Sequence, residues 1–311
     1  MDSIKRNSIR IGSKKTNLWL RARTIHSIRC FFIQRGYLEV ETPHLIPAPA
    51  PEAHIDAIMA GEGFLHPSPE LCMKRLLSAN YPTIFQICKV FRHGERGVLH
   101  LPEFTLLEWY RLGISYLDLM DECEEMILFV VREGSLGHKI EYRGREIDLQ
   151  RPWNRISVRE AFRRYASLPL EKALELKRFD EILVEEIEPH LGIPKPVFLY
   201  EYPASFASLA RLKKDDPGVA ERFELYIGGL EIANAFSELT DPMEQKTRFE
   251  EEQKRRRSLG KRCYPSPVRF LQDLYQMPPS AGIALGIDRL VMIFANTSNI
   301  ENVVSFTPDE L

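Results

Sequence analysis

The sequence predicts an α+β fold in which an antiparallel sheet is flanked by helices. Two observations underlie the predictions of this fold class and of a single domain. Strand-like segments occur in neighbouring pairs rather than in regular alternation with helices, a pattern that argues against a parallel βαβ sheet. No internal repeat or low-complexity linker divides the 311 residues, and one large enzyme domain can reach this length. We therefore expect a single domain over residues 1–311, preceded by no separate module.

The composition is that of an ordinary globular protein with enough apolar residues for a large core. Hydrophobic residues make up 44% of the chain and charged residues 28%, and the formal net charge is −2. A protein that binds a long stretch of nucleic acid usually carries a basic excess. Bulk charge therefore gives no support for a nucleic-acid ligand.

Cysteine and histidine usage excludes several classes of site. The five cysteines are scattered and form no CxxC pair, so neither a disulfide framework nor a zinc site is predicted. The eight histidines show no HxH or HExxH spacing. Residues 1–15 are basic and polar and suggest a flexible arm, and no apolar run approaches the length of a membrane span. We expect a reduced cytoplasmic protein without a membrane partner.

The first elements are a helix and a strand. Apolar residues from Thr16 to Arg35 follow helical spacing, and Gly36 stands where a helix commonly ends. Residues 37–43 alternate in polarity and predict a strand that ends at Pro43. Three prolines between residues 47 and 51 predict a loop.

The middle of the chain predicts paired strands and further helices. Residues 84–91 and 104–110 are strand-like and enclose a polar loop, and a helix follows over about residues 116–132. Residues 140–149 predict a short hairpin. Ser157 and Glu160 have the spacing of a capping box at the start of another helix.

The C-terminal part begins with a strand at 197–202 and a strand, Gly-Gly turn and strand over 223–239. Asp241-Pro242 opens a long charged helix that ends near Gly260, and its run 250–257 (EEEQKRRR) predicts a solvated face with internal ion pairs. Residues 281–295 predict a glycine-rich strand that leads into an apolar helix.

One segment, FRHGERGVLHLPEFTLLEWYR at 91–111, concentrates candidate chemistry. It places Arg92 at the end of one strand, and Glu108 and Tyr110 toward the end of the next. The planar donors of an arginine match a phosphate or a carboxylate. For an isolated arginine, an ion pair in a solvated loop is the simpler interpretation.

The whole segment, however, resembles motif 2 of the class II aminoacyl-tRNA synthetases, and PEFTLLEWY is most similar to the lysine enzymes. GYLEVETPHL at 36–45 resembles motif 1 of that family, and GIALGIDRLVM at 282–292 resembles motif 3. The three segments occur in the family's order. The resemblance implies the class II catalytic fold and a homodimer assembled on motif 1.

The resemblance also implies that the enzyme binds ATP and Mg²⁺. Arg92 and Arg289 would be catalytic through their contacts with the phosphates, and Glu224 and Glu231 would hold Mg²⁺. The implied ATP-binding residues are Arg92, Glu95, His100, Phe104, Glu231, Ile232, Gly286 and Arg289.

Two further segments, 66–77 and 224–239, resemble the parts of the lysine enzymes that hold the amino acid. The implied substrate-binding residues are Ser68, Pro69, Glu70, Glu108, Tyr110, Asn234, Phe236, Glu238 and Ala284. A buried lysine ammonium needs negative charge and acceptors in place of water. Glu231 and Glu238 fall on opposite faces of a regular strand, so they converge only if a bulge or turn lies between them.

Because motif 1 lies near the start of the sequence, we expect no anticodon-binding domain before it. The resemblance is therefore closest to the truncated paralogues of the lysine enzymes that attach lysine or β-lysine to translation elongation factor P. Ala284, where the synthetases carry glycine, fits these ligases better, and tRNA is then not expected as a partner.

The chain departs from the family's motif 2 at His93, Gly94 and Leu101, which leaves adenine recognition to Glu95 or to backbone groups. Two alternatives stay open. One is a freestanding enzyme that acylates tRNA or another amine. The other is a synthetase-like regulatory module without activity.

Overall fold

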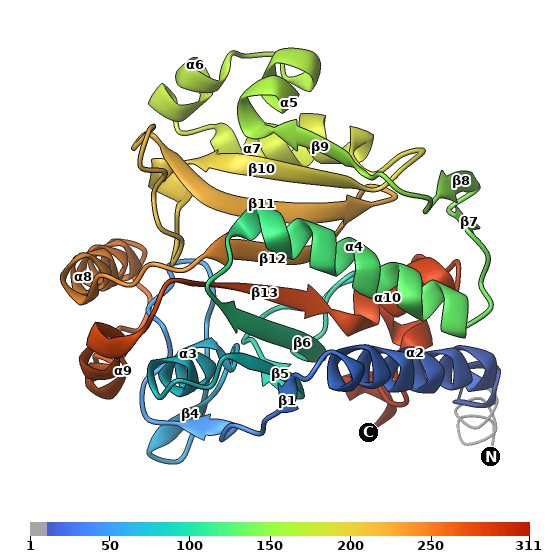
Figure 1. Cartoon of the computed structure of the whole chain (residues 1–311), viewed down its shortest axis with the longest axis horizontal. Coiled ribbons are helices and arrows are strands. Elements are labelled where there is room, and N and C mark those ends of the chain that lie inside the picture. Colours follow the sequence, from blue (N-terminus) through green and yellow to red (C-terminus); the bar gives the residue numbers. More distant parts are fainter. Residues whose placement is uncertain (1–10) are drawn as a thin grey trace.

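The computed structural model describes residues 11–311 and is built on one eight-stranded sheet (Figure 1). Neighbouring strands run antiparallel except at the two edges, where β1 with β5 and β9 with β10 are parallel. In spatial order the strands are β1 (Leu38–Glu39), β5 (Thr83–Phe91), β6 (Glu103–Leu112), β13 (Ser280–Gly286), β12 (Leu230–Ser237), β11 (Val219–Ile227), β10 (Val197–Pro203) and β9 (Asn154–Ser157). The α+β class and the antiparallel sheet are confirmed.

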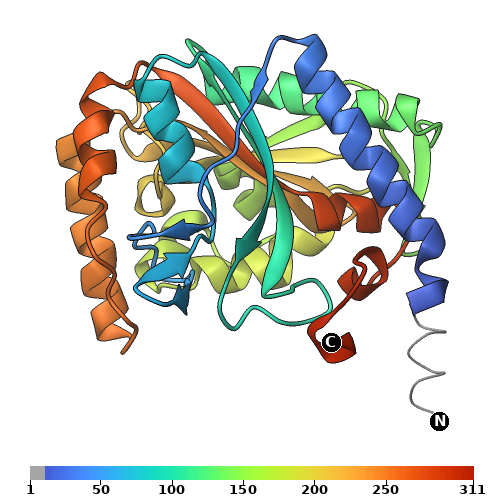
Figure 2. The same cartoon turned by 90° about the horizontal axis from the view of Figure 1, so that it is seen from below.

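One face of the sheet, which we call the helix face, packs against three helices (Figures 1 and 2). These are α2 (Lys15–Gln34), α4 (Tyr116–Glu133) and α10 (Ile287–Phe294). Aromatic side chains fill the layer between them, with Phe32 stacked on Phe85 at 4.8 Å between ring centroids and 5.1 Å from Trp109. This layer is the largest core of the described residues.

The remaining elements lie at the ends and edges of the sheet. α3 (Glu70–Ser78), α9 (Val268–Asp273) and α8 (Pro242–Ser258) pack in a row beside it, as Figure 2 shows. Over the β9–β10 edge, α5 (Val158–Tyr165), α6 (Leu170–Glu175) and α7 (Phe179–Ile182) form a second core. The smaller sheets comprise β2 (Leu45–Ile46), β4 (Gly63–Leu65) and β3 (Ile58–Ala60), and the hairpin β7 (Lys139–Tyr142) and β8 (Arg145–Asp148). Short helical turns are η1 (Leu183–Ile187), η2 (Glu188–His190), η3 (Ala204–Phe206), η4 (Leu274–Gln276), η5 (Ile300–Val303) and η6 (Pro308–Glu310).

Local sequence signals account for several boundaries. Gly36 ends α2 with a positive φ of 75°, which glycine adopts without the steric cost of a side chain. Asp241 caps α8, because its carboxylate accepts from the backbone N–H groups of Met243 and Glu244 at 2.8 and 3.1 Å. Ser115 and Asp118 form a reciprocal capping box at the start of α4.

Three local expectations need correction. The strand expected over 37–43 pairs with β5 only at Leu38 and Glu39, at the sheet edge. Ser157 accepts from the N–H of Glu160 at 3.2 Å, but the Glu160 carboxylate pairs with Arg163 and Arg164 instead of closing the capping box.

The third correction concerns charged residues that the sequence placed in solvent. Arg256, within the run 250–257, is buried with 1% of its surface exposed. Residues 1–10 of the expected arm lie outside the described residues, but residues 11–13 are helical and Lys14 is buried against Glu310, 2.7 Å from its carboxylate. None of the helices within residues 11–311 is long and apolar enough to cross a membrane.

Candidate active site

Two cross-strand rows bring most of the predicted site residues onto the face opposite the helices, which we call the catalytic face. Residues directly opposite each other on neighbouring strands share a face. The first row runs across four strands through Glu108, Ala284, Asn234 and Glu224. The second, two residues along, runs through Tyr110, Gly282, Phe236 and Arg222.

A β-bulge in β12 explains how Glu231 can lie on the same face of the sheet as Glu238. The register with β11 shifts so that Leu225 opposes Ala233 while Tyr226 opposes Glu231, which leaves Ile232 as the extra residue. One added residue reverses the alternation of side chains. Glu231 therefore shares the catalytic face with Glu238, as convergence requires. The Ile232 side chain points into the main core, so only its backbone can take part in the site.

At one end of the catalytic face, which we call the arginine end, Arg289 is held by groups from two other segments. Its guanidinium donates to the backbone oxygen and carboxylate of Glu231 at 2.9 and 3.1 Å. Its second terminal nitrogen lies 2.7 Å from Nε2 of His100, in the loop between β5 and β6. Burial and the adjacent Arg289 lower the pKa of His100, so this ring stays neutral and can accept from the guanidinium.

Arg92 approaches the same end from β5 and its following loop. Its guanidinium carbon lies 5.0 Å from the ring centroid of Phe104, and its terminal nitrogen is 3.7 Å from the Glu95 carboxylate. Arg92 remains about one-quarter exposed, so its charge is available to a ligand. Two arginines on one face form a site suited to phosphates or a carboxylate.

A buried carboxylate, which the sequence did not lead us to predict, holds the arginine end in place. Asp288, next to Arg289 and 1% exposed, accepts from the backbone N–H of Thr105 at 2.7 Å and pairs with Arg21 of α2. Arg21 also donates to the Thr105 hydroxyl at 2.7 Å. The start of β6, beside Phe104, is therefore tied to the start of α10. The adjacent Asp-Arg in motif 3 was the available signal.

The other end of the catalytic face holds three carboxylates, Glu70, Glu108 and Glu238, which we call the carboxylate pocket. Glu108 accepts from the hydroxyls of Ser68 and Tyr110 at 2.6 and 2.7 Å, both neutral donors. Burial, reinforced by repulsion from Glu70, raises the pKa of Glu108 to about 7. Pro69 precedes α3 as its N-cap residue and places Glu70 in the first turn.

Lys74, absent from the predicted set, reaches the pocket from α3. Its Nζ lies 2.5 Å from the Glu238 carboxylate and also pairs with Glu70 one turn earlier. Burial raises the pKa of Glu238 to about 8, although Lys74 opposes this shift. Burial acts to lower the pKa of Lys74, but the charges of Glu238 and Glu70 outweigh it and raise that pKa. The i, i+4 spacing of Glu70 and Lys74 was a signal in the sequence.

The strand floor of the pocket is shaped by Gly282. A Cβ there would lie 2.2 Å from the Tyr110 ring and 2.5 Å from Oε1 of Glu238. That oxygen accepts no hydrogen bond from any residue in the described part of the chain. Ala284, half-buried between Glu108 and Asn234, is the next residue on this floor.

Glu224 and Glu231 were the predicted metal ligands. Glu224 is buried and accepts from Tyr202, Tyr226 and Arg222 at 2.5, 2.7 and 2.7 Å. Burial, with repulsion from Glu231 opposing Arg222, raises the pKa of Glu224. Residues 11–311 contain no cluster of three metal-binding side chains. Two mutually repelling carboxylates fit Mg²⁺ shared with phosphates, because Mg²⁺ is commonly bound by one or two carboxylates and phosphate oxygens.

A loop at residues 52–57 is fastened beside the site by Arg256. The Arg256 guanidinium donates to the backbone oxygens of Glu52 and Ile55 at 2.6 and 2.9 Å, and to Asp56 at 2.6 Å. The backbone carbonyl oxygen of Asp56 in turn accepts from the N–H of His93 at 2.6 Å. Burial and repulsion from Glu70 raise the pKa of Glu52 to about 7. This anchor was missed because helical charge patterns alone cannot show which arginine is buried.

Comparison with known proteins identifies the family of the chain. The family model for class II tRNA synthetases (D, K and N) matches residues 7–310. A Salmonella gallinarum protein named elongation factor P–(R)-β-lysine ligase is 38% identical over 313 residues, covering 94% of this chain and 95% of that protein. Proteins of the same name are 37% identical in Edwardsiella ictaluri, covering 94% of this chain and 95% of the relative, and 38% identical in Proteus mirabilis, covering 93% and 94%.

Proposed function

This chain belongs to the class II tRNA synthetases of the D, K and N types, and from that premise we propose that it is an ATP-dependent, AMP-forming ligase. It activates lysine or (R)-β-lysine as an aminoacyl-adenylate and transfers the aminoacyl group to a lysine side chain of translation elongation factor P. The relatives that share 37–38% of its residues carry the corresponding name.

The observation that carries this proposal is the joining of two kinds of site on one sheet face. The carboxylate pocket suits a ligand with ammonium groups, since Glu108 has only neutral donors and Oε1 of Glu238 is free of hydrogen bonds from the described residues. The arginine end, with Arg92 and Arg289, suits a triphosphate. An amino acid with a cationic side chain and ATP would meet between them.

The chemistry needs no nucleophilic side chain. A carboxylate oxygen of the amino acid attacks the α-phosphorus of ATP, and the bond to pyrophosphate breaks. The neutral amine of the acceptor lysine then attacks the adenylate carbonyl carbon and displaces AMP. Arg92 and Arg289 stabilise the negative charge of the first transition state, and the pocket orients the amino acid.

Glu224 and Glu231 are the residues that would hold Mg²⁺ in this proposal. The bound cation would neutralise phosphate charge and relieve the repulsion between the two carboxylates. Phe104, beside Arg92, would stack on the adenine base.

The proposal includes a twofold homodimer, with residues 11–311 acting as one catalytic domain. Its support is a set of exposed apolar side chains on α2 and the edge strand: Trp19 is 61% exposed, Ile33 58% and Leu38 49%. A twofold interface would cover this surface in both protomers. A sedimentation experiment that finds only a 36.1 kDa species at micromolar concentration would contradict it.

We further propose a cytoplasmic location. All five cysteines are free thiols, as a reducing compartment would keep them.

The test of the function has two stages. Lysine-dependent and β-lysine-dependent ATP–pyrophosphate exchange separates an enzyme from an inactive binding module. Labelled amino acid is then offered with purified elongation factor P or with bulk tRNA. Transfer to the factor alone is the expected result. Transfer to tRNA, or no exchange with either amino acid, would overturn the proposal.

A further inference from the structure

The carboxylate pocket contains a cation of its own. Lys74 is 1% exposed, and its Nζ lies between Glu70 and Glu238, 2.5 Å from the latter. The ammonium also lies 5.0 Å from the ring centroid of Phe236, in the second cross-strand row. It therefore contacts the wall of the pocket on the α3 side and on the β12 side at once.

Charge counting shows what this lysine does to the pocket. Three carboxylates and one ammonium leave two formal negative charges when all are ionised. Tyr110 on β6 is a neutral donor, and burial with repulsion from Glu108 keeps it neutral by raising its pKa. From the neighbouring loop, Glu52 adds negative charge, and Arg92 and Arg222 oppose it. A ligand with two ammonium groups would match the pocket itself.

Lys74 also controls how readily these carboxylates ionise. The pKa of Glu108, about 7, and that of Glu238, about 8, are both raised by burial and both lowered by Lys74. Without this cation, nothing would oppose the effect of burial on Glu108 and Glu238 from the α3 side, and both would take up protons more readily. A protonated carboxyl group cannot form an ion pair with a ligand ammonium.

We propose that Lys74 is a positioning residue that bridges Glu70 and Glu238 and favours the charged form of Glu238, so that the pocket selects an amino acid with two ammonium groups. This inference rests on the proposed function for the identity of the amino acid. It assigns Lys74 no contact with the reacting atoms.

The test compares Lys74→Met with Arg75→Met. Arg75 is the next residue of α3, but it pairs with Asp273 outside the pocket and is 40% exposed, so it is a matched control. Calorimetric titration with lysine and with norleucine, which lacks the second ammonium, is carried out at pH 7.0 and pH 8.5. ATP binding is measured in parallel, and thermal unfolding verifies the fold.

The expected result is a loss of lysine affinity in Lys74→Met by about 10- to 100-fold at pH 7.0, because removal of the cation raises the pKa of Glu238 further above the pH and each unit of that rise costs about tenfold. The loss should shrink at pH 8.5, where the carboxyl groups ionise. ATP binding and the Arg75→Met variant should match the parent. The preference for lysine over norleucine should fall in Lys74→Met alone.

Two outcomes would overturn the inference: unchanged lysine affinity, or a loss of the same size at both pH values, which would indicate a structural role only. Should Lys74→Met fail to fold, Lys74→Arg decides. That variant keeps the cation and should retain the parent's pH dependence, and a changed pH dependence would count against the inference. A parent protein that binds lysine yet gives no pyrophosphate exchange would refute the proposed function and leave the role of Lys74 intact.

Discussion

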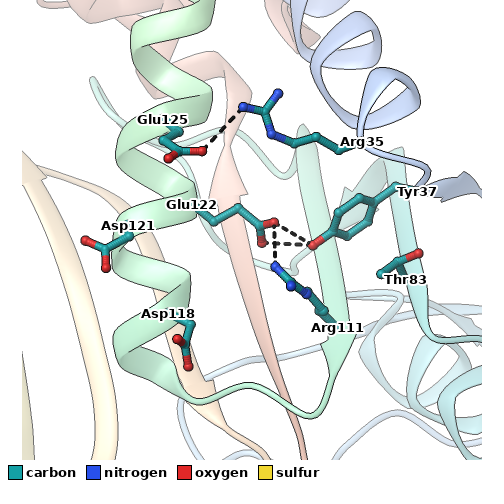
Figure 3. Close-up of a pocket in the computed structure, with 8 residues that line it drawn as sticks. All are labelled: Arg35, Tyr37, Thr83, Arg111, Asp118, Asp121, Glu122 and Glu125. Atoms are coloured by element: carbon teal, nitrogen blue, oxygen red, sulfur yellow. Dashed lines mark hydrogen bonds and ion pairs between the residues drawn. The ribbon is translucent and has the colours of Figure 1, made fainter.

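A buried carboxylate network involves strand β6 on each face of the sheet. The two networks differ in how the carboxylate charge is matched by nearby cations. On the helix face, Glu122 of α4 accepts from the Tyr37 hydroxyl at 2.8 and 2.9 Å and from the Trp109 indole at 3.1 Å. Arg111 lies 3.6 Å away beside a cavity of about 470 Å³ (Figure 3). On the catalytic face, the hydrogen-bond donors to Glu108 within residues 11–311 are Ser68 and Tyr110 alone.

The difference separates a structural carboxylate from one prepared for a ligand. Glu122 has a cation of its own, and its donors come from strand β6 and the turn before β1, which it ties to α4. Three carboxylates of the catalytic face share the single ammonium of Lys74, so their charge is only partly matched. A buried carboxylate without its own cation either takes up a proton or binds a cationic ligand. The carboxylates of the catalytic face are left partly unmatched in this way, whereas Glu122 on the helix face is not.

The largest effect on this comparison is expected from filling the space over Gly282 on the catalytic face. Gly282→Ala places a methyl group against the Tyr110 ring and Glu238, so both must move. We expect lysine-dependent pyrophosphate exchange to fall by about 100-fold or more, because displacements near 1 Å at a reacting site have effects of that size. Gly12→Ala, at a glycine with open space, is the control and should match the parent. Exchange near the parent level in folded Gly282→Ala would show that the pocket can yield.

Substitution of arginines on the two faces should separate effects on activity from effects on stability. Arg92→Ala and Arg289→Ala should each reduce adenylate formation by about 100-fold or more, the usual effect of losing a donor to developing charge. Arg111→Met should leave exchange unchanged and cost about 1–3 kcal/mol in unfolding free energy, because it leaves the buried Glu122 carboxylate without its cation. Exchange kinetics and urea denaturation check both. An Arg289→Ala variant with normal exchange would remove that residue from the site.

The pH dependence of the catalytic face should have opposite signs for folding and for binding. The folded pKa values of Glu108 and Glu238, about 7 and about 8, lie above the ordinary 4.5. Their stabilising protonation is complete below about pH 4.5 and is lost as the pH rises through 7 and 8. The melting temperature of the free protein should therefore fall over that range while lysine affinity rises. Glu108→Gln should reduce the step near pH 7, to which Glu52 also contributes with its pKa of about 7, and parallel rather than opposed trends would contradict the assignment.

The smallest expected effect concerns Ala284. The Ala284→Gly variant removes one methyl group from the pocket floor between Glu108 and Asn234. Such a change alters discrimination between ligands by roughly 1–3 kcal/mol. The ratio of exchange rates with lysine and β-lysine should shift, with ATP affinity unchanged. Equal ratios in variant and parent would show that this position does not shape the pocket.

Much of the fold could be predicted because it is local in the sequence. The strand-like composition of 84–91 and 104–110, the Gly-Gly turn and the Asp241 cap each determine an element through neighbouring residues. The bulge at Ile232 could be stated only as a requirement, because a one-residue shift depends on pairing with β11. The length of β1 was overestimated for a similar reason, since an edge strand's length is decided by its partner.

The site was predicted from resemblance to family motifs, and the residues missed are those that act between motifs. Lys74, Asp288 and Arg256 each pair with groups from distant parts of the chain. Their burial offsets the usual preference of charged residues for water, and only the assembled structure shows the partners that make it tolerable. The face shared by Glu231 and Glu238 follows from the bulge, whereas the roles of the predicted ligands stay predictions.

The buried ammonium of Lys74 also bears on whether the enzyme acylates itself. An activated aminoacyl group generated beside it would meet the nearest lysine of the chain before any acceptor, yet acylation requires a free lone pair on nitrogen. Glu238 and Glu70 raise the pKa of Lys74, and even an unperturbed lysine is neutral in fewer than about one molecule in a thousand at pH 7. The same ion pairs therefore protect the ligase from modifying itself, and intact-mass measurement after turnover should find Lys74 unacylated.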